Sequence, residues 1–323
     1  MTTERIVVLD GFTLNPGDID WAPFAALGPL EVHDRTSEAQ VVARTGDAAC
    51  VLLNKTPMAR ATLAALPRLR YIGVLATGYN VIDLRATAAQ GITVTNVPTY
   101  GTDSVAQHAA AMMLEHARGL VAHHRAVQTG EWTRDPDWCF ARRPVFELTG
   151  RTLGLVGLGR IGLAFARIAA AMGMRVVAHD PHWPAPERMD AVSVASLSLD
   201  AVFREADVIS LHCPLTPDNF QIVDAARLST MKPTALLINT SRGQLVDNAA
   251  LAAALRGGVI GGAALDVLDV EPPPATNPLL GAPNCLITPH IAWYAIEARR
   301  RLMQIAADNL AGFLRGAPVN TVQ

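Results

Sequence analysis

The chain has 323 residues, a formal net charge of −2 at pH 7, and a composition that is 50% hydrophobic and 17% charged. This composition is typical of a globular protein with a sizeable core, and the length suggests about two domains. The near-neutral charge gives no electrostatic reason to expect a nucleic-acid or membrane partner. The N-terminus does not resemble a secretory signal, and no apolar run reaches the roughly 18 residues of a membrane span.

Four cysteines stand far apart and form no CxxC pair, namely Cys50, Cys139, Cys213 and Cys285. This spacing is neither that of a zinc site nor that of a disulfide framework, so we expect no metal. Because free cysteine is often buried, we expect reduced, buried thiols in a cytoplasmic protein.

The predicted elements begin with four short apolar strands at residues 5–10, 49–54, 71–76 and 92–96. One long helix is expected from Thr102 to Gln128, with Ser104 and Gln107 as its capping box. Six further strands are expected at residues 152–157, 175–180, 207–212, 235–240, 262–267 and 285–288. A helix from Ala292 to Arg315 closes the chain.

Most of these strands are continuously apolar, which is typical of strands buried on both faces of a sheet. Their alternation with helical stretches implies crossover connections and parallel pairing. The long helix separates the first four strands from the last six. The sequence therefore predicts an α/β fold with two parallel sheets.

A glycine-rich turn joins the strand at residues 152–157 to the helical stretch that follows. Gly157 allows a tight turn, Gly159 leaves room for a pyrophosphate at the backbone, and Gly162 permits close helix–strand packing. The helix N-terminus offers free N–H groups to phosphates, and Arg160 adds a charge beside them. The turn predicts a dinucleotide site.

Asp180 ends the next strand, about 20 residues after the turn. An acidic residue there accepts hydrogen bonds from the adenosine ribose and repels a 2′-phosphate. No arginine directly follows it, and His182 is the nearest cationic candidate. We therefore expect NAD, with NADH preferred over NADPH.

Three chemically active residues follow three consecutive strands: Arg242, Glu271 and His290. Because ligands of open parallel sheets lie beyond the carboxyl ends of the strands, these side chains are expected to converge on one crevice. Arg242 can bind a carboxylate in two places, and His290 can donate or accept a proton. Glu271 would favour the imidazolium form and orient the ring. This set fits hydride transfer to a 2-oxo acid.

Each residue also has an ordinary interpretation: Arg242 as a loop ion pair, Glu271 as a solvated carboxylate, His290 as a structural residue. Asp266 could orient His290, lie near the cofactor or bond a turn. His108 and His116 are expected at an interface or on the surface. The dinucleotide turn upstream favours the catalytic interpretation of the set of three.

The motifs "GLVGLGRIG", "VVAHDP", "MKPTALLINTSRGQLVD", "AALDVLDVEPP" and "NPLLGAPNCLITPHIAW" resemble the D-isomer-specific 2-hydroxyacid dehydrogenase family. "VLATGYNVIDL" and "GEWTRDPDWCF" are similar to its glycerate dehydrogenase, or hydroxypyruvate reductase, branch. The resemblance implies two doubly wound parallel-sheet domains, with a Rossmann NAD-binding domain inserted into a flavodoxin-like substrate domain. We expect the substrate domain at residues 1–99 and 289–323 and the NAD-binding domain at 100–288.

The resemblance also implies site residues. The family's catalytic set carries over onto Arg242, Glu271 and His290, and the backbone at Ala76, Thr77 and Gly78 would bind the substrate carboxylate, with Asn54 nearby. A homodimer through the long helix is implied as well. Further cofactor contacts are expected at Ile161, Cys213, Pro214, Thr240 and Asp266.

Two departures leave the 2-oxo acid open, with hydroxypyruvate or glyoxylate expected. Tyr294 and Ala295 stand where the branch has small residues and a threonine, and Ala141 where it often has tryptophan. One alternative is a formate dehydrogenase of the same fold, although that enzyme carries glutamine at the position of Glu271. Another is a dinucleotide-sensing binding protein like the corepressors of this superfamily.

Overall fold

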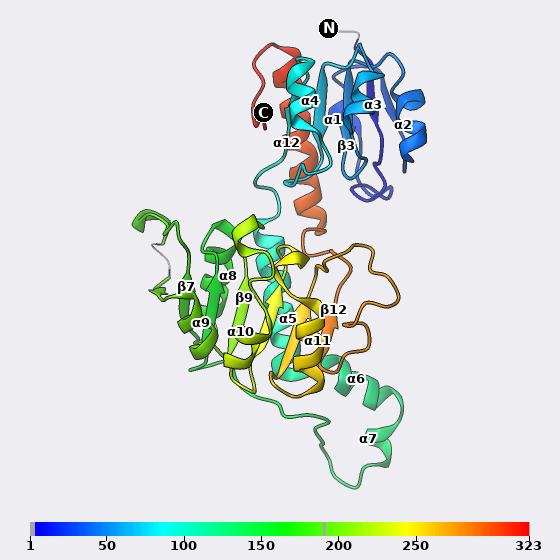
Figure 1. The fold of residues 1–323 in the computed structure, drawn as a ribbon. Helices are drawn as coiled ribbons and strands as arrows, with labels where there is room; N and C mark the ends of the chain where they lie inside the picture. Colours follow the sequence, from blue (N-terminus) through cyan, green and yellow to red (C-terminus); the bar gives the residue numbers. More distant parts are fainter. Residues whose placement is uncertain (1–3, 190–191, 323) are drawn as a thin grey trace. The chain divides into compact units, whose positions relative to one another are not determined.

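The computed structural model describes residues 4–189 and 192–322, and the chain divides into two compact units (Figure 1). One unit holds residues 1–101 and 294–323, and the other holds residues 102–293. The sequence placed the second boundary after residue 288. In the structure residues 289–293 belong with the inserted unit, because Asp266 accepts hydrogen bonds from the backbone N–H groups of Ile291 and Ala292.

The first unit contains a parallel sheet with the strand order β2-β1-β3-β4-β5, counted over the described residues. This is the flavodoxin-like order. The strands are β1 (Ile6–Val8), β2 (Leu30–Val32), β3 (Cys50–Leu53), β4 (Tyr71–Val74) and β5 (Thr93–Thr95). Its helices are α1 (Ala22–Ala25), α2 (Glu38–Thr45), α3 (Arg60–Ala64), α4 (Leu84–Ala89) and α12 (Ile296–Leu314).

The second unit contains a parallel sheet with the order β12-β11-β10-β9-β6-β7-β8 within the described ranges. Renumbered within the unit, its first six strands follow the Rossmann order, with a seventh at the edge. The strands are β6 (Thr152–Val156), β7 (Arg175–His179), β8 (Ala195–Ser196), β9 (Val208–Leu211), β10 (Leu236–Asn239), β11 (Gly262–Leu265) and β12 (Cys285–Ile287).

Helices cover both faces of this second sheet, and each face has its own apolar core. The helices are α5 (Thr102–Arg118), α6 (Leu120–Gln128), α7 (Glu131–Arg134), α8 (Arg160–Ala171), α9 (Leu199–Glu205), α10 (Ala225–Thr230) and α11 (Asn248–Arg256). Met113 and Phe165 from α5 and α8 lie in one core. Phe203, Leu228 and Leu251 from α9, α10 and α11 lie in the other.

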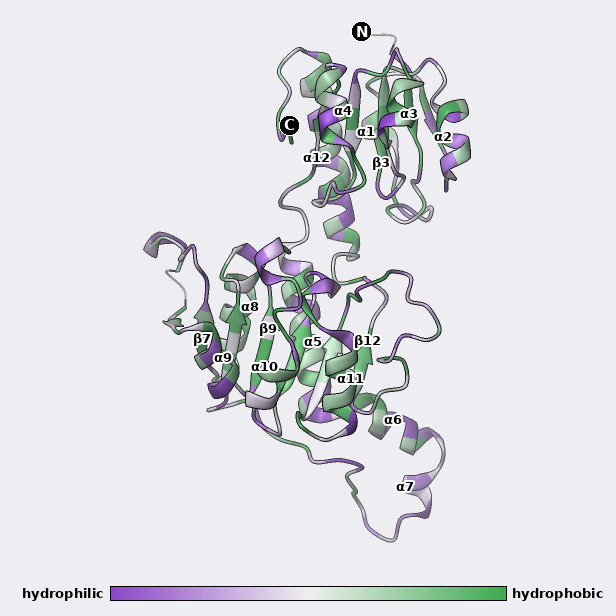
Figure 2. Ribbon diagram, viewed as in Figure 1, coloured by the Kyte–Doolittle hydropathy of each residue, from purple (hydrophilic) through white to green (hydrophobic). Residues whose placement is uncertain are grey.

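The central strands are mostly apolar and are buried, and Figure 2 shows hydrophobic strands beneath helices with mixed surfaces. This arrangement confirms the predicted α/β class with two parallel sheets. Within the described residues, no helix combines the length and the apolarity that crossing a bilayer requires.

Several predicted details were wrong. The sequence analysis missed the strands β2 and β8, which lie at sheet edges and are short and partly or fully exposed. Both strands pair on one side only, and neither has the continuous apolar pattern of a buried strand. Cys139 is exposed rather than buried.

The long helix predicted from Thr102 to Gln128 is two helices, because Gly119 adopts a left-handed conformation with φ of 59° between α5 and α6. The predicted capping box at Ser104 is also wrong. α5 begins at Thr102, and the Ser104 hydroxyl instead donates a hydrogen bond to the carbonyl of Ala292 at 2.5 Å. The last helix begins at Ile296, four residues later than predicted.

Within the first unit, a buried arginine fastens the last helix to the loop after β1. The Arg299 side chain is 4% exposed and pairs with both carboxylate oxygens of Asp18, at 2.7 and 2.6 Å. The same guanidinium donates to the carbonyls of Leu14 and Tyr294. Hydrogen bonds from Arg299 hold the pKa of the Asp18 carboxyl below its usual value.

We expect Asp18→Asn to lower the thermal stability at pH 7, because the variant loses the charge that pairs with Arg299. A carboxyl whose pKa is depressed by folding stabilises the protein above its unfolded pKa, and this contribution disappears as pH falls through the folded pKa. The difference in Tm between wild type and variant should therefore shrink below about pH 4. Scanning calorimetry from pH 7 to pH 2.5 measures it, and a pH-independent difference would contradict this role.

Candidate active site

The three glycines of the turn after β6 serve different purposes. Gly157 has φ of 98°, and a Cβ on it would lie 2.6 Å from the backbone nitrogen of Cys213. A Cβ on Gly162 would overlap the carbonyl oxygen of Gly157. A Cβ on Gly159 would meet no atom within 4 Å. The fold thus requires Gly157 and Gly162, whereas at Gly159 it leaves open space at the N-terminus of α8, as a phosphate-binding turn requires.

Asp180 lies directly after β7 and is bonded to this turn. One carboxylate oxygen accepts a hydrogen bond from the backbone nitrogen of Leu158 at 2.6 Å. The other accepts from the backbone nitrogen of His182 at 2.7 Å. The carboxylate therefore lies beside the glycine turn, where an adenosine ribose would need an acceptor.

Two neighbouring strands bring further predicted cofactor residues to the same edge. Cys213 and Pro214 follow β9, and Thr240 follows β10, which pairs with β9. Burial raises the pKa of the Cys213 thiol to about 11, so this thiol is neutral and no nucleophile at pH 7. The Thr240 hydroxyl oxygen is buried and has no hydrogen-bond partner within the described part of the chain. An orphaned buried hydroxyl at the same edge of the sheet as the dinucleotide turn fits a group that binds a cofactor.

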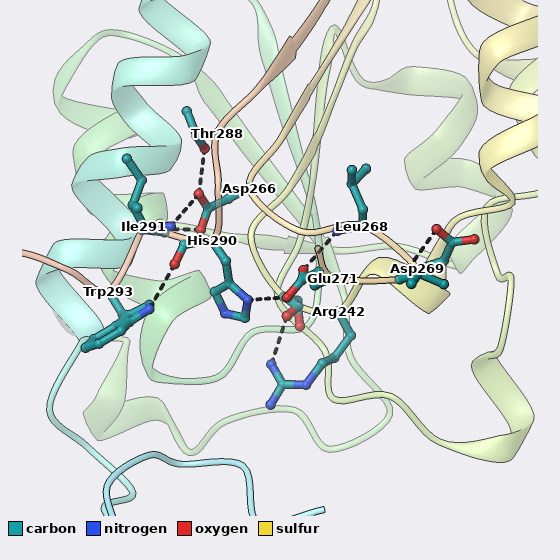
Figure 3. Close-up of polar contacts among 12 residues, drawn as sticks. Arg242, Asp266, Leu268, Asp269, Glu271, Thr288, His290, Ile291 and Trp293 are labelled. Carbon is teal, nitrogen blue, oxygen red and sulfur yellow. Dashed lines mark hydrogen bonds and ion pairs between the residues drawn. The ribbon is translucent and has the colours of Figure 1, made fainter. Parts of the chain in front are cut away.

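The loop after β10 carries Arg242 and is packed on the loop after β11. A Cβ on Gly243 would overlap the carbonyl group of Leu268, so only glycine permits this approach. The close approach sets the segment from Leu268 to Glu271 beside Arg242. The Arg242 guanidinium donates to the carbonyl of Ser241 at 2.8 Å and is shown with its neighbours in Figure 3.

Glu271 and His290 form a direct contact between the loops after β11 and β12. The Oε2 atom of Glu271 lies 2.6 Å from Nδ1 of His290, and both side chains are 36% exposed. The other carboxylate oxygen accepts from the backbone nitrogen of Leu268 at 3.0 Å. Figure 3 shows the imidazole directed at Glu271. Because Nδ1 is hydrogen-bonded to this carboxylate, Nε2 is the ring nitrogen that can exchange a proton with a ligand.

Asp266 organises the loop that carries His290. Its buried carboxylate accepts hydrogen bonds from the Thr288 hydroxyl at 2.5 Å and from the backbone nitrogens of Ile291 and Ala292 at 2.9 and 2.8 Å. Its carbonyl accepts from the backbone nitrogen of His290 at 2.9 Å. These contacts support the interpretation in which Asp266 orients His290, because they hold the loop that carries this residue.

In the first unit, the predicted substrate residues lie after two adjacent strands. Asn54 follows β3, and Ala76, Thr77 and Gly78 follow β4. The carbonyls of Ala76 and Thr77 accept hydrogen bonds from the backbone nitrogen of Val97 and the amide of Asn96, which fixes the peptide groups of this turn.

Sequence reasoning missed the group that holds Asn54. The carboxylate of Asp10, after β1, accepts hydrogen bonds from the backbone nitrogens of Asn54, Lys55 and Thr56 at 2.7, 2.5 and 2.9 Å. Burial raises the pKa of the Asp10 carboxyl, and these backbone donors oppose the shift. The available signal was an aspartate at the end of the first strand, beside the topological switch between β1 and β3.

The contact made by His108 was not predicted from the sequence. Its side chain is 21% exposed and Nε2 lies 3.1 Å from the hydroxyl of Thr288, next to the His290 loop. His212 directly follows β9. Burial lowers the pKa of His212 to about 4, so its ring is neutral at pH 7.

The model of the NAD binding domain of D-isomer specific 2-hydroxyacid dehydrogenases matches residues 110–292. The chain belongs to this family. It is 48% identical to a hydroxypyruvate reductase of Blautia hydrogenotrophica, over 98% of this chain and 99% of that protein. It is 40% identical to a glycerate dehydrogenase of Methylorubrum extorquens, over 99% of both chains. The predicted family is thereby confirmed, and the chain is an oxidoreductase of 2-hydroxy acids that binds NAD(H).

Solved structures agree with this assignment. A NADPH-dependent glyoxylate/hydroxypyruvate reductase of Sinorhizobium meliloti is 31% identical, with a TM-score of 0.83. The similarity covers 99% of this chain and 97% of that chain. Since that relative uses NADPH, the family alone does not decide which dinucleotide this chain prefers.

The glycine turn generates a prediction with an internal control. Gly159→Ala should fold at least as stably as wild type, because its Cβ meets no atom and φ is −72°. It should weaken NADH binding at least about tenfold, since the methyl group occupies the space left for the ligand. Gly162→Ala should instead cost about 1–3 kcal/mol of stability through overlap with Gly157. Thermal melts and NADH fluorescence titration measure both, and unchanged affinity in Gly159→Ala would contradict this use of the turn.

Proposed function

We propose that this chain is an NAD(H)-dependent D-2-hydroxyacid dehydrogenase that reduces a small 2-oxo acid, with hydroxypyruvate or glyoxylate as the favoured substrates. The observation that carries the proposal is the 2.6 Å contact between Glu271 and His290 on loops packed beside Arg242. The names of the relatives support the substrate, since they include a hydroxypyruvate reductase, a glycerate dehydrogenase and several glyoxylate reductases.

Each residue of this set has one task. Arg242 binds the substrate carboxylate through its planar fork and so orients the 2-oxo group. His290 gives the proton on Nε2 to the carbonyl oxygen during reduction, and its neutral ring takes the hydroxyl proton during oxidation. Glu271 holds the ring by Nδ1 and stabilises its positive charge. The chemistry supplied by bound NADH is the hydride for the carbonyl carbon.

Other residues bind rather than react. Within the first unit, the backbone N–H groups of Ala76, Thr77 and Gly78, with Asn54 nearby, are the substrate-binding groups. The cofactor is held by the glycine turn, by Asp180, and by Arg160, Ile161, Cys213, Pro214 and Thr240.

The protein acts in the cytoplasm as a homodimer. The exposed apolar side chains of α6, including Leu120 at 63% and Val121 at 46%, support pairing through α5 and α6. The free thiols of the four cysteines are consistent with a reducing compartment.

A panel of 2-oxo acids with NADH, followed by loss of nicotinamide absorbance, tests the function. Arg242→Ala should lower kcat/KM for hydroxypyruvate by about 100-fold or more, because the carboxylate no longer sets the reacting geometry. NADH affinity should be unchanged. Arg256→Ala is the matched control, since Arg256 donates to the carbonyl of Pro278 away from the proposed set.

The same panel separates the alternatives. Wild type that binds NADH but turns over no 2-oxo acid would overturn the proposal and favour a dinucleotide-sensing protein. Reduction of NAD by formate would favour a formate dehydrogenase. Equal kcat/KM in wild type and Arg242→Ala would remove Arg242 from the mechanism.

The preference for NADH over NADPH is assigned to Asp180, whose carboxylate repels a 2′-phosphate. Asp180→Ser should raise the ratio of kcat/KM for NADPH to that for NADH by at least about tenfold. Because Asp180 also bonds Leu158, the variant loosens the turn for both dinucleotides, and the ratio isolates the effect of the charge. An unchanged ratio would show that Asp180 does not discriminate between them.

A further inference from the structure

The segment that carries His290 is bonded to α5 at two points. The Ser104 hydroxyl donates to the carbonyl of Ala292 at 2.5 Å, and Nε2 of His108 lies 3.1 Å from the Thr288 hydroxyl. Residues four apart lie on the same face of a helix, so one face of α5 contacts the segment on both sides of His290. The reaction described above uses neither Ser104 nor His108.

The hydrogen bonds among His108, Thr288 and Asp266 can run in only one direction. Thr288 lies 2.5 Å from a carboxylate oxygen of Asp266, which can only accept while it is ionised. A hydroxyl has one hydrogen, so Thr288 gives its hydrogen to Asp266 and can only accept from His108. Nε2 of His108 must therefore carry a hydrogen, and a chain of donors runs from His108 through Thr288 to Asp266.

This chain ends on the carboxylate that holds the His290 loop. Besides Thr288, the Asp266 carboxylate binds the backbone nitrogens of Ile291 and Ala292. His290 itself has φ of 56°, a left-handed conformation that residues with a Cβ rarely adopt. Such a conformation persists where the surroundings impose it, and here Asp266 and the two α5 contacts do so.

We propose that His108 is a positioning residue for His290: by donating to Thr288 it orients the Asp266 carboxylate, which holds the left-handed backbone that aims the imidazole. The proposal rests on the proposed function, because it assigns a task within the proton transfer by His290. The Nε2 atom of His108 also lies 3.6 Å from the Asp266 carboxylate oxygen that accepts from Thr288, so the ring faces the groups that hold the His290 loop. Its effect is therefore expected on the proton-transfer step rather than on carboxylate binding.

Thr288 gives a matched pair of variants. Thr288→Val keeps the shape and removes the hydroxyl, whereas Thr288→Ser keeps the hydroxyl. Thr288→Val should lower kcat for hydroxypyruvate about 10- to 100-fold, with KM for hydroxypyruvate and Kd for NADH within about twofold of wild type. Thr288→Ser should retain kcat within about threefold. A loss of kcat in both variants, or in neither, would overturn the proposal.

His108 is tested with the same logic. His108→Phe removes the donor and should lower kcat about tenfold, and His108→Gln, whose amide can donate, should recover most of it. If His108→Phe does not fold, His108→Asn replaces it, because that side chain is too short to reach Thr288. In the double variant His108→Phe with Thr288→Val, kcat should be no lower than with Thr288→Val alone, since both remove one chain of bonds. Fully additive losses would contradict the chain.

Hydrogen exchange separates this proposal from the proposed function. A peptide covering residues 288–293 reports the amides of His290, Ile291 and Ala292, all of which bond to Asp266. Its exchange should quicken at least about tenfold in Thr288→Val and His108→Phe, and stay near wild type in Thr288→Ser and His108→Gln. If wild type turns over no 2-oxo acid, the function fails, and exchange alone then decides whether His108 holds the loop. Unchanged exchange in His108→Phe overturns the positioning role in either case.

Discussion

The approach of the Leu268 carbonyl to Gly243 is the constraint on which the arrangement of the active-site loops depends. Glycine is needed there because a Cβ would overlap the carbonyl group. This contact joins the loop after β10 to the loop after β11. The same segment then turns so that Glu271 bonds the Leu268 nitrogen with one oxygen and His290 with the other. The absence of a side chain at Gly243 thus lets three loops bring Arg242, Glu271 and His290 together.

A second device recurs in both units: an aspartate at the end of one strand accepts backbone hydrogens from the loop after a neighbouring strand. Asp10 after β1 holds the loop after β3, and Asp180 after β7 holds the turn after β6. Asp266 after β11 holds the loop after β12. Parallel neighbours place their carboxyl ends at one edge, so a short acidic side chain can reach across. Rigid binding loops result without a covalent link, which limits the reorganisation needed when a ligand binds.

The sequence was informative where burial determines the pattern. The central strands are mostly apolar, and the order of Arg242, Glu271 and His290 after consecutive strands predicted that parallel pairing would bring their loops together. The edge strands β2 and β8 could not be found in this way, because they are short and have no apolar pattern of their own. The break at Gly119 was missed because the apolar composition continues on both sides of it.

The position of His108 could not be predicted from local pattern for a different reason. Its partner Thr288 lies 180 residues away in the chain, and helical periodicity does not reveal which distant loop a given face will meet. Asp266 posed a related problem, since an aspartate at the end of a strand is equally suited to a cofactor, a histidine or a turn. Only the positions of the surrounding N–H groups distinguish these roles.

Under the proposed preference for NADH, Asp180 has two tasks. Its negative charge discriminates against a 2′-phosphate, while one of its oxygens holds Leu158 in the turn that receives the pyrophosphate. A change that admits NADPH therefore weakens the turn that both dinucleotides need. For this fold to accept NADPH well, a new donor for the phosphate and a new acceptor for the Leu158 nitrogen must arise together. We therefore expect dinucleotide preference and the hydrogen bonding of the glycine turn to change together.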